Sequence, residues 1–407
     1  MNLTENKECL ACGHEHLTPV LDLNDQPLAN SYKKSEYEVE VSYPLKINRC
    51  NNCYHVQLSH AVDPDLIYKN YLYVSGTTKT YVDYMEWYAD FCIETFGDKV
   101  DSVLDIGCND GSQLNAFKSR GSKTYGVDPA ENLYHLSSKN HNVVCGYFDD
   151  SYKQRVDVIT IQNAFAHNPN PLELLKNCKL NLKPKGLIFI QTSQSDMILN
   201  NEFDTIYHEH ISFYNILYMS LLCKRAGLEL IDTVKTPIHG TSYIFVISAD
   251  RKCEARLKNL ISMENIAGLY KSSTYNKYAQ SCNDMVNKFK AVIEYRRTLG
   301  YKIVGYGAAA KANTFLNFAK VTFDMIIDDN PLKQGLYTPG SSVGIVSSDI
   351  LKTFTEHDKI LFVPLAWNFF EEIKERIIAK RNNKNDVFLN MKNLNFLMFK
   401  ILNMKNF

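Results

Sequence analysis

Short apolar runs alternate with helical stretches between about residues 100 and 250, and this alternation limits the possible folds more than any other feature. The runs are SVLDIG, KTYGVD, VDVITIQN and GLIFIQTS, each bounded by turn residues. Buried strands separated by helices are typical of βαβ units and a mostly parallel sheet. After a polar helical linker near 252–298 the pattern restarts with KIVGYG, FDMIIDD and KILFVP. The sequence therefore predicts an α/β fold followed by a second, smaller α/β unit.

The composition is that of a folded globular protein. The 407 residues are 45% hydrophobic, with 45 basic and 45 acidic side chains, so no whole-chain basic field exists to hold nucleic acid or an anionic membrane. The sequence contains no stretch of about 18 uncharged apolar residues, so it predicts no transmembrane helix. The N-terminus lacks the pattern of a signal peptide. We therefore expect a cytoplasmic monomer that binds neither nucleic acid nor membranes.

The N-terminal region contains two closely spaced cysteine pairs, Cys9 with Cys12 and Cys50 with Cys53. In a reducing compartment such pairs indicate a metal site more than disulfides. Four thiolates complete a tetrahedral shell around Zn²⁺ and leave no position for a substrate, so the predicted role is structural. Two alternatives remain, namely four unligated thiols, or one cysteine replaced by a neighbouring histidine (His14, His16 or His55).

The segment VLDIGCNDGSQL places Asp105, Gly107 and Gly111 after the first strand of the central region. This spacing differs from the Gly-x-Gly-x-x-Gly of dinucleotide binders, whose glycines approach a pyrophosphate. Asp128 ends the next strand, where a carboxylate can accept hydrogen bonds from both ribose hydroxyls of an adenosine group. The combination favours S-adenosylmethionine (SAM) over NAD. The remaining candidates for the cofactor site are Asn109, Pro129, Asn163 and Ala164.

Residues 206–210 read IYHEH, which concentrates groups that transfer protons. The metalloprotease motif His-Glu-x-x-His spaces its histidines four apart on one helix face. His208 and His210 are two apart, so on a helix they would point in different directions, whereas in extended chain they share one side. The protease interpretation is therefore excluded, and the spacing leaves the role of the segment open.

Read together and in order, the motifs resemble those of sugar C-methyltransferases over about residues 5–375. They are the cysteine pairs with QPLANSY, NYLYVSGT, VLDIGCNDGSQL, AFAHNPNP, FDTIYHEH and GYGAAAKANTFLN. The resemblance implies methylation of a nucleotide-linked 4-keto-deoxysugar at C3. It also implies a zinc-binding N-terminal domain (1–75), a class I Rossmann-like SAM-binding methyltransferase domain (76–250) and a C-terminal Rossmann-like domain for the nucleotide sugar (251–407).

Methylating carbon requires a nucleophilic carbon, and therefore a base and a stabilised enolate. The resemblance implies that His210 is the base that removes the C3 proton, because a neutral imidazole suits that task near neutral pH. Tyr207 and Glu209 are then its supporting groups, and His208 helps to bind the sugar or polarise the ketone.

Two more side chains are expected around the same crevice, a histidine and one of two tyrosines. His167 follows the third strand of the central domain and can reach it. A tyrosine of NYLYVSG, either Tyr71 or Tyr73, is expected to close it.

The C-terminal motif GYGAAAKANTFLN has a Gly-x-Gly turn between strand and helix. Helix N-terminal amides can face a phosphate, so the motif suits the anionic nucleotide end of the substrate. NAD is the alternative ligand, although nothing else indicates hydride chemistry. The candidate substrate-binding residues are Tyr306, Lys311, Asn313, Asp329 and Asn368. Of these, Asp329 and Asn368, together with Lys333, either line the nucleotide groove or serve the fold.

One departure from the family pattern concerns the sugar. Where a run like GGSxR is expected, residues 240–244 read GTSYI, with Thr241 and Ile244 at the altered positions. Two other functions remain as alternatives. A sugar O- or N-methyltransferase would act on an acceptor that already carries a lone pair. A non-catalytic zinc-containing binding protein would be expected to show a basic face, which the neutral composition does not support.

Overall fold

The computed structural model describes residues 2–192, 196–238, 242–252 and 254–391 of the chain. The chain forms two compact units. The first comprises Met1–Val20, Lys46–Asn200 and Glu209–Thr274, and the second comprises Leu21–Leu45, Asn201–His208 and Tyr275–Phe407. The boundaries at 75/76 and 250/251 expected from the sequence stay a prediction.

A seven-stranded sheet forms the centre of the first unit, in the order β12-β13-β10-β9-β6-β7-β8. Its strands are β6 (Ser102–Ile106), β7 (Lys123–Asp128), β8 (Asn142–Cys145), β9 (Val156–Gln162), β10 (Leu182–Thr192), β12 (Glu229–Thr236) and β13 (Ser242–Ser248). Strands β6, β7, β8, β9 and β10 are parallel to one another. Strand β13 is antiparallel to both of its neighbours, β10 and β12. The four apolar runs that predicted a mostly parallel sheet lie in β6, β7, β9 and β10.

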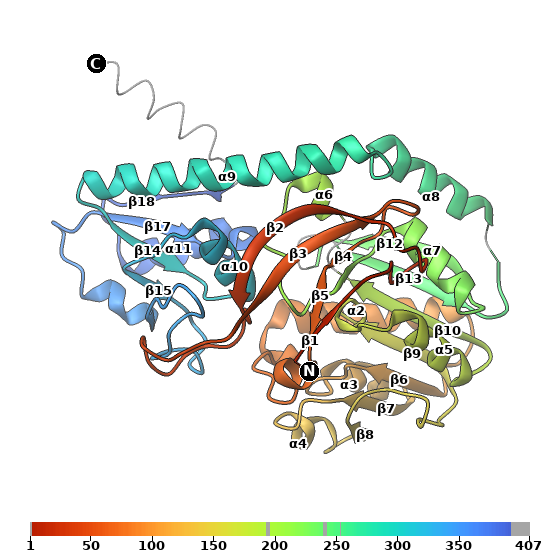
Figure 1. The fold of residues 1–407 in the computed structure, drawn as a ribbon. Coiled ribbons are helices and arrows are strands. Elements are labelled where there is room, and N and C mark those ends of the chain that lie inside the picture. The colour runs from red at the N-terminus through yellow and green to blue at the C-terminus, as the bar shows by residue number, and fades with distance from the viewer. Residues whose placement is uncertain (1, 193–195, 239–241, 253, 392–407) are drawn as a thin grey trace. The chain divides into compact units, whose positions relative to one another are not determined.

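Helices cover both faces of this sheet (Figure 1). Successive side chains of β10 alternate between two cores, as a strand buried on both faces requires. Leu187 and Phe189 pack with α2 and α3, whereas Ile188 and Ile190 pack with α5 and α7. The helices of this unit are α1 (Asp65–Tyr68), α2 (Lys79–Phe96), α3 (Ser112–Ser119), α4 (Tyr134–Ser137), α5 (Pro171–Leu180), α6 (Met197–Asn200), α7 (Ile216–Arg225) and α8 (Glu254–Ala267), with 3₁₀ turns η1 (Ser75–Thr77) and η2 (Phe165–His167).

Two small sheets accompany the cysteine-rich region. The first pairs β1 (Leu3–Glu5) with β5 (His60–Val62). The second has the order β11-β4-β3-β2. Its strands are β2 (Leu17–Pro27), β3 (Ser42–Cys50), β4 (Val56–Leu58) and β11 (Ser212–Phe213). Strand β11 therefore brings residues that directly follow IYHEH into the sheet of the cysteine-rich region.

The second unit contains a five-stranded sheet in the order β16-β15-β14-β17-β18, with parallel pairing throughout. Its strands are β14 (Lys302–Tyr306), β15 (Met325–Ile327), β16 (Ile345–Val346), β17 (Ile360–Pro364) and β18 (Val387–Phe388). The accompanying helices are α9 (Ser272–Thr298), α10 (Ala310–Ala319) and α11 (Phe370–Lys380), with η3 (Ser348–Lys352) and η4 (Trp367–Phe369). Phe289 of α9 meets Phe315 of α10 edge to face at 4.9 Å between ring centroids. The second, smaller α/β unit expected from the restarting pattern is confirmed.

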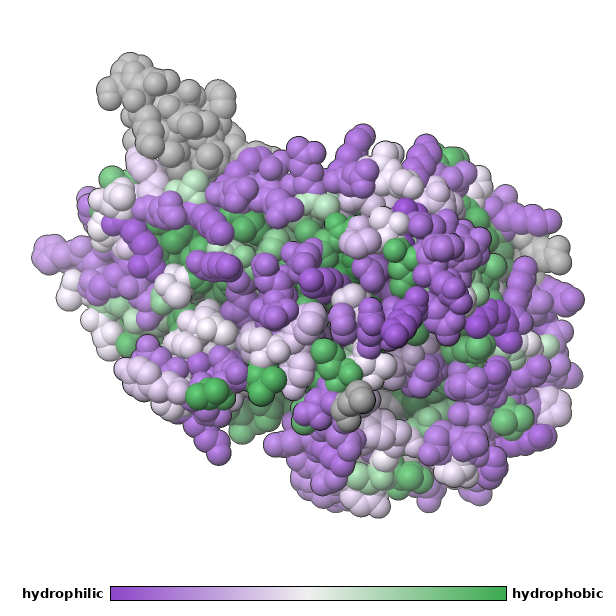
Figure 2. Space-filling view, in the orientation of Figure 1, coloured by the Kyte–Doolittle hydropathy of each residue, from purple (hydrophilic) through white to green (hydrophobic). Residues whose placement is uncertain are grey.

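Hydrophilic side chains cover most of the face shown in Figure 2, and hydrophobic ones are scattered among them. Among the described residues, no helix combines the length and hydropathy needed to cross a membrane.

Candidate active site and metal centre

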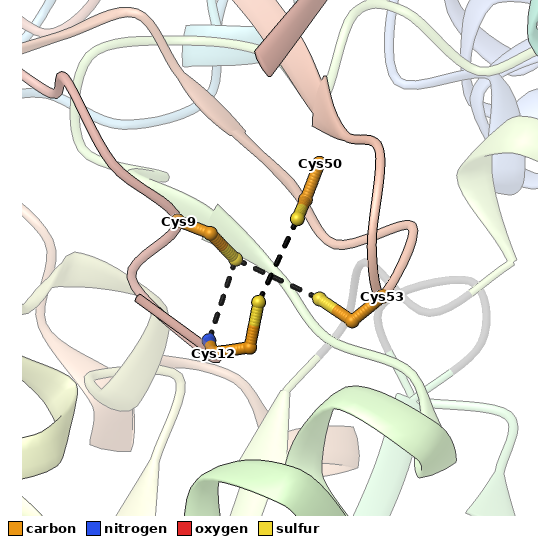
Figure 3. A group of neighbouring side chains, drawn as sticks. All are labelled: Cys9, Cys12, Cys50 and Cys53. Carbon is orange, nitrogen blue, oxygen red and sulfur yellow. Dashed lines mark hydrogen bonds between the residues drawn. The ribbon is translucent and has the colours of Figure 1, made fainter. Parts of the chain in front are cut away.

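The sulfur atoms of Cys9, Cys12, Cys50 and Cys53 point toward one another and lie within 4.8 Å of each other (Figure 3). The Sγ–Sγ distance is 3.6 Å both for the pair Cys9–Cys53 and for the pair Cys12–Cys50. A tetrahedral Zn²⁺ with Zn–S bonds of about 2.3 Å requires sulfur–sulfur distances of about 3.8 Å. The four thiols therefore have the donor type and the close spacing that a tetrahedral zinc site needs.

The two cysteine turns are built alike. In the first, Cys9 N–H donates to His14 O at 2.9 Å and Gly13 N–H donates to Cys9 O at 2.7 Å. In the second, Cys50 N–H donates to His55 O at 2.8 Å and Tyr54 N–H donates to Cys50 O at 3.1 Å. Both turns thus orient their thiols by the same backbone bonds.

None of the neighbouring histidines joins the four thiols in the metal-binding group found among the described residues. His55 is buried, and its Nε2 lies 3.2 Å from Ser212 Oγ. His14 Nδ1 accepts from the backbone N–H of His16 at 3.2 Å. The four-cysteine set is therefore the one that fits the metal.

The glycine loop that follows β6 has positive φ at three positions: Gly107 (78°), Asn109 (50°) and Gly111 (82°). This left-handed region favours glycine and tolerates asparagine. A Cβ on Gly107 would also lie 2.6 Å from Ala164 Cβ. Glycine at 107 is therefore required both by the backbone conformation and by the close approach of the segment after β9.

Asp128 ends β7 and holds the glycine loop. Its Oδ2 accepts from Asn109 N–H and its Oδ1 from Ala130 N–H, both at 2.8 Å. A carboxylate has about four acceptor positions, so capacity remains for ribose hydroxyls. Burial raises the pKa of Asp128, and the two backbone N–H groups oppose that shift. Pro129, which follows Asp128 directly, has no N–H group to compete for the carboxylate.

Asp105 lies within β6 and is buried. Its Oδ1 accepts from Thr160 Oγ1 at 2.7 Å. Burial raises the pKa of Asp105 to about 7, against the lowering effect of the Thr160 hydrogen bond.

Asn163 follows β9 with a φ of 53°. Its N–H donates to Gln191 O at 2.9 Å and its Nδ2 donates to Tyr81 Oη at 3.3 Å. Its Oδ1 is buried and has no hydrogen-bond partner among the described residues. Because Ala164 touches Gly107, this free acceptor lies beside the glycine loop, where it fits a cofactor donor group.

His167, in the turn that follows Asn163 and Ala164, belongs to a stack of aromatic rings. His167 stacks on Tyr68 with ring centroids 5.5 Å apart and on His210 with centroids 5.3 Å apart. His210 is 4% exposed. Burial lowers the pKa of His167 to about 4, so this imidazole is neutral at physiological pH. Its Nε2 has no hydrogen-bond partner among the described residues.

Glu209 is held by two tyrosines. Tyr71 Oη donates to its Oε2 at 2.8 Å, and Tyr68 Oη donates to its backbone O at 3.4 Å. The other tyrosine of NYLYVSG, Tyr73, has a half-exposed ring, and its backbone O accepts from Asn109 Nδ2 at 3.0 Å. Of the two, the structure therefore brings Tyr71 to the Glu209 and His210 segment.

The IYHEH segment is divided between the two units after His208. Residues 207–209 form a bend and a turn, so the side-by-side arrangement of an extended strand does not apply to His208 and His210. Within the second unit, His208 Nε2 lies 3.2 Å from Tyr43 O, and burial lowers the pKa of His208 to about 4. Tyr207 is half-buried and belongs to the same unit. The roles expected for both residues stay predictions.

The second unit repeats the acid-capped glycine loop. Gly307 has a φ of 97°. Asp328 accepts from Ala308 N–H at 2.7 Å and from Asn330 N–H at 2.9 Å, as Asp128 does in the first unit. Lys333 adds a cation, since its Nζ donates to Ala308 O at 2.7 Å and lies 3.7 Å from Asp328.

Three other residues expected to bind the nucleotide, Tyr306, Asn313 and Lys311, lie close to groups of the protein itself. Tyr306 Oη donates to Asp329, whose Oδ2 also lies 3.1 Å from Arg376 Nη1. Asn313 is buried, and its Nδ2 donates to Ala29 O at 2.8 Å. Lys311 lies near Asp204, and its charge lowers the pKa of that carboxyl, which burial raises to about 6.

The side chain of Asn368 and the residues Gly240 and Thr241 of the GTSYI run lie outside the described residues. Ile244, where the family run has arginine, is buried in the core of β13 between α2 and α3.

Comparison with known proteins gives three successive family matches. A model described as a zinc binding domain matches residues 9–68, one described as a methyltransferase domain matches 83–233, and one described as a C-methyltransferase C-terminal domain matches 237–389. The C-methyltransferase NovU of Streptomyces niveus is 27% identical over 384 residues, which cover 90% of this chain and 91% of NovU. In this order along the chain, the matches make it similar to C-methyltransferases that carry a zinc-binding N-terminal domain.

The N-terminal match contains all four cysteines of the metal centre, and the central match contains the glycine loop, Asp128 and the IYHEH segment. A ubiquinone biosynthesis O-methyltransferase of Coxiella burnetii is 28% identical over 169 residues, 36% of this chain and 72% of the relative. Among solved structures, a SAM-dependent methyltransferase from Clostridium acetobutylicum is similar with a TM-score of 0.36 and 15% identity, covering 41% of this chain and 92% of that one.

Sequence reasoning missed two features of the site. Tyr68 lies three residues before Tyr71, outside the motif NYLYVSG, and nothing in its spacing indicates that it stacks on His167. The contact of β11 with β4 was also missed, because a strand of two residues, Ser212–Phe213, leaves no periodic signal.

Cys9→Ser should reduce bound zinc well below the one ion per chain expected for wild type, because it removes one of four thiolate ligands. Metal analysis of protein purified without chelator measures this. Cys145→Ser, which changes an exposed thiol outside the cluster, should leave the zinc content unchanged. A wild-type chain without zinc would contradict the assignment.

Asp105 should make stability depend on pH. Its folded-state pKa of about 7 lies above its ordinary value of 3.8, so the folded state binds more protons between these values. The free energy of unfolding should therefore fall as pH rises through this window and level off above it. Asp105→Asn should abolish this component, as measured by urea unfolding of both proteins across the window. Asp98→Asn, at an exposed carboxylate, controls for the loss of one charge, and a wild-type-minus-variant difference that is constant with pH would refute the prediction.

Proposed function

We propose that this enzyme transfers the methyl group of SAM to C3 of a nucleotide-linked 4-keto-deoxysugar through a base-generated enolate. The stack of His210 on His167 supports this proposal most directly. His167 follows Asn163 and Ala164 in sequence, and Ala164 touches Gly107 of the cofactor loop. A buried imidazole is thus held at the carboxyl end of β9, where class I sheets bind their ligands.

We assign the cofactor to the loop between β6 and α3. Asp128 would accept hydrogen bonds from the ribose hydroxyls, while Asp105, Gly107, Asn109 and Gly111 shape the loop. Asn163 Oδ1, buried and without a partner among the described residues, would accept from a donor of the cofactor. When bound there, SAM supplies an electrophilic methyl group, whose bond to sulfur breaks as the bond to the substrate carbon forms.

The proposed chemistry begins with proton removal. His210 takes the proton from C3, and the electron pair of that C–H bond forms an enolate with its charge on the C4 oxygen. The C3 carbon then attacks the methyl group, and the proton on His210 passes to solvent. His167 is the poorer base, since an imidazole with a pKa of about 4 accepts a proton weakly. We place it as a neutral support that orients His210.

The groups next to His210 are proposed to support it and to fix the Glu209 carboxylate beside it. Tyr71 holds the carboxylate of Glu209 by a 2.8 Å hydrogen bond, and Glu209 directly precedes His210 in the chain. As the family resemblance implies, His208 is proposed to bind the sugar or polarise the ketone, and Tyr207 is proposed to support His210. The site excludes water in part through burial, since Glu209 and His210 are each 4% exposed.

We propose that the second unit binds the nucleotide. The Gly307 loop presents backbone N–H groups at the start of α10, and Lys333 and Lys311 add positive charge nearby. Asp329 is engaged by both Tyr306 and Arg376, and Asn313 is engaged by Ala29 O. These contacts favour a supporting role for Asp329 and Asn313.

Asp128→Asn should weaken SAM binding by about ten- to hundredfold, because it removes charge-assisted hydrogen bonds worth about 1–3 kcal/mol. Isothermal titration calorimetry measures this. Asp328→Asn is a matched control, since Asp328 caps the equivalent loop of the second unit, and it should leave SAM affinity near wild type. Loss of SAM binding in Asp328→Asn but not in Asp128→Asn would reverse the assignment.

His210→Ala should lower methyl transfer by about 10²- to 10⁴-fold, the usual contribution of a positioned base, with SAM affinity near wild type. It should also stop exchange of the substrate C3 proton in deuterated water, measured by NMR. The substrates are 4-keto-deoxyhexoses linked to thymidine, uridine, cytidine or guanosine diphosphate. His357→Ala, at an exposed histidine of the second unit, is the control.

If His210→Ala exchanged the C3 proton at the wild-type rate, His210 would not be the base. His167→Ala would then be tested next. If the wild-type enzyme methylates an acceptor without exchanging C3, the acceptor is an oxygen or nitrogen, and the proposed carbon chemistry is wrong.

A further inference from the structure

The chain that carries the proposed base has no regular structure of its own. Residues 201–211 contain neither helix nor strand, and yet His210 and Glu209 are buried. A base must be held within a fraction of an ångström of its productive position. The elements that bracket this segment must therefore hold it in place.

The residue after the base is fixed on both sides by its backbone. Ile211 N–H donates to Ala166 O at 2.8 Å, which ties it to the turn that carries His167. Ile211 O accepts from Leu58 N–H, also at 2.8 Å. Ile211 thus joins the methyltransferase sheet to β4 of the cysteine-rich region.

The same connection continues along β11. Ser212 pairs with Gln57 and Phe213 with Val56 in an antiparallel register. Strand β4 is the neighbour of β11 in its sheet. Two residues of β11 cannot form a stable ladder alone, so the position of β11 depends on β4.

Both cysteine turns hold β4 in turn. Gln57 is buried, and its side-chain amide accepts from Leu10 N–H and donates to Glu8 O, both at 2.9 Å, on either side of Cys9. His55 accepts at its backbone O from Cys50 N–H, and its ring lies 3.2 Å from Ser212 Oγ. The metal-binding turns are therefore joined through β4 to the residue two positions after His210.

We propose that the zinc-binding module positions the base, with His55, Gln57 and Ser212 as positioning residues. Zinc would fix the two cysteine turns, the turns fix β4, and β4 fixes β11 and the backbone of Ile211. The inference rests on the proposed role of His210. It gives the zinc module a task in catalysis beyond local folding, which acts through the connected backbone.

Hydrogen exchange tests the mechanical part without any activity measurement. Zinc is removed from the full chain with a chelator, and deuterium uptake is followed by mass spectrometry. Uptake should rise in 1–62 and also in 207–214, with 102–112 of the cofactor loop little changed. A rise confined to 1–62, or a rise across the whole first unit, would overturn the inference.

Ser212→Ala tests the catalytic part, because it removes the hydroxyl that meets His55 and leaves all four thiols in place. Methyl transfer and C3 exchange should fall about 10- to 100-fold, as expected for a displaced catalytic group. Zinc content, the KM for the sugar and SAM affinity should stay within about twofold of wild type, and Ser212→Thr, which keeps a hydroxyl, should recover most of the rate. The substrate is the member of the four-nucleotide panel that exchanges fastest with wild type.

Thr18→Ala is the matched control, since it removes a hydroxyl bonded to Asn51 at 2.8 Å in the second cysteine turn, away from β11. If Ser212→Ala behaves like Thr18→Ala while His210→Ala abolishes exchange, the positioning role is wrong and the proposed function stands. If His210→Ala leaves exchange intact, the proposed function fails whatever Ser212→Ala does.

Discussion

Two hydrogen bonds on the backbone of Ile211 connect the parts of the first unit that the chemistry requires. The bond to Ala166 holds the IYHEH chain against the turn after β9, and the bond from Leu58 holds it against the zinc-binding region. The sheet supplies a glycine loop and an acid at one edge, as class I methyltransferases do. The buried imidazole of His210 is placed near the same edge, because the backbone of the next residue, Ile211, is fixed. Without this connection, the backbone next to His210 would lose its two ties within eleven residues of irregular chain.

Both α/β units contain a glycine loop held by an aspartate, although we propose different ligands for the two loops. Asp128 ends β7 and Asp328 follows β15, and each accepts from a glycine-loop N–H and from the N–H two residues further on. They differ in their surroundings, because Lys333 lies 3.7 Å from Asp328. A lysine beside the acid partly neutralises it, which suits a phosphate. The Asp128 carboxylate keeps its acceptor capacity, which suits ribose hydroxyls.

Sequence reasoning was most effective where one short segment carries the whole signal. The parallel strands follow from apolar runs between turns, and the metal centre follows from two cysteine pairs, because a close pair within one turn is a local property. The stack of Tyr68 on His167 and the pairing of Ser212 with Gln57 join residues 99 and 155 positions apart in the chain. Single-sequence periodicity contains no information on such contacts. The spacing of His208 and His210 excluded a protease helix but left the local conformation open, and the structure has a turn at 208–209.

Carbon methylation is the central claim, and the position of the transferred methyl group tests it most directly. The enzyme would be incubated with SAM labelled with ¹³C in its methyl group and with the panel of nucleotide-linked 4-keto-deoxysugars. Heteronuclear NMR of the product then shows which atom carries the label. The account predicts a ¹³C-methyl group bonded to C3, with direct carbon–carbon coupling when the sugar is also labelled at C3. A label bonded to oxygen or nitrogen would contradict it.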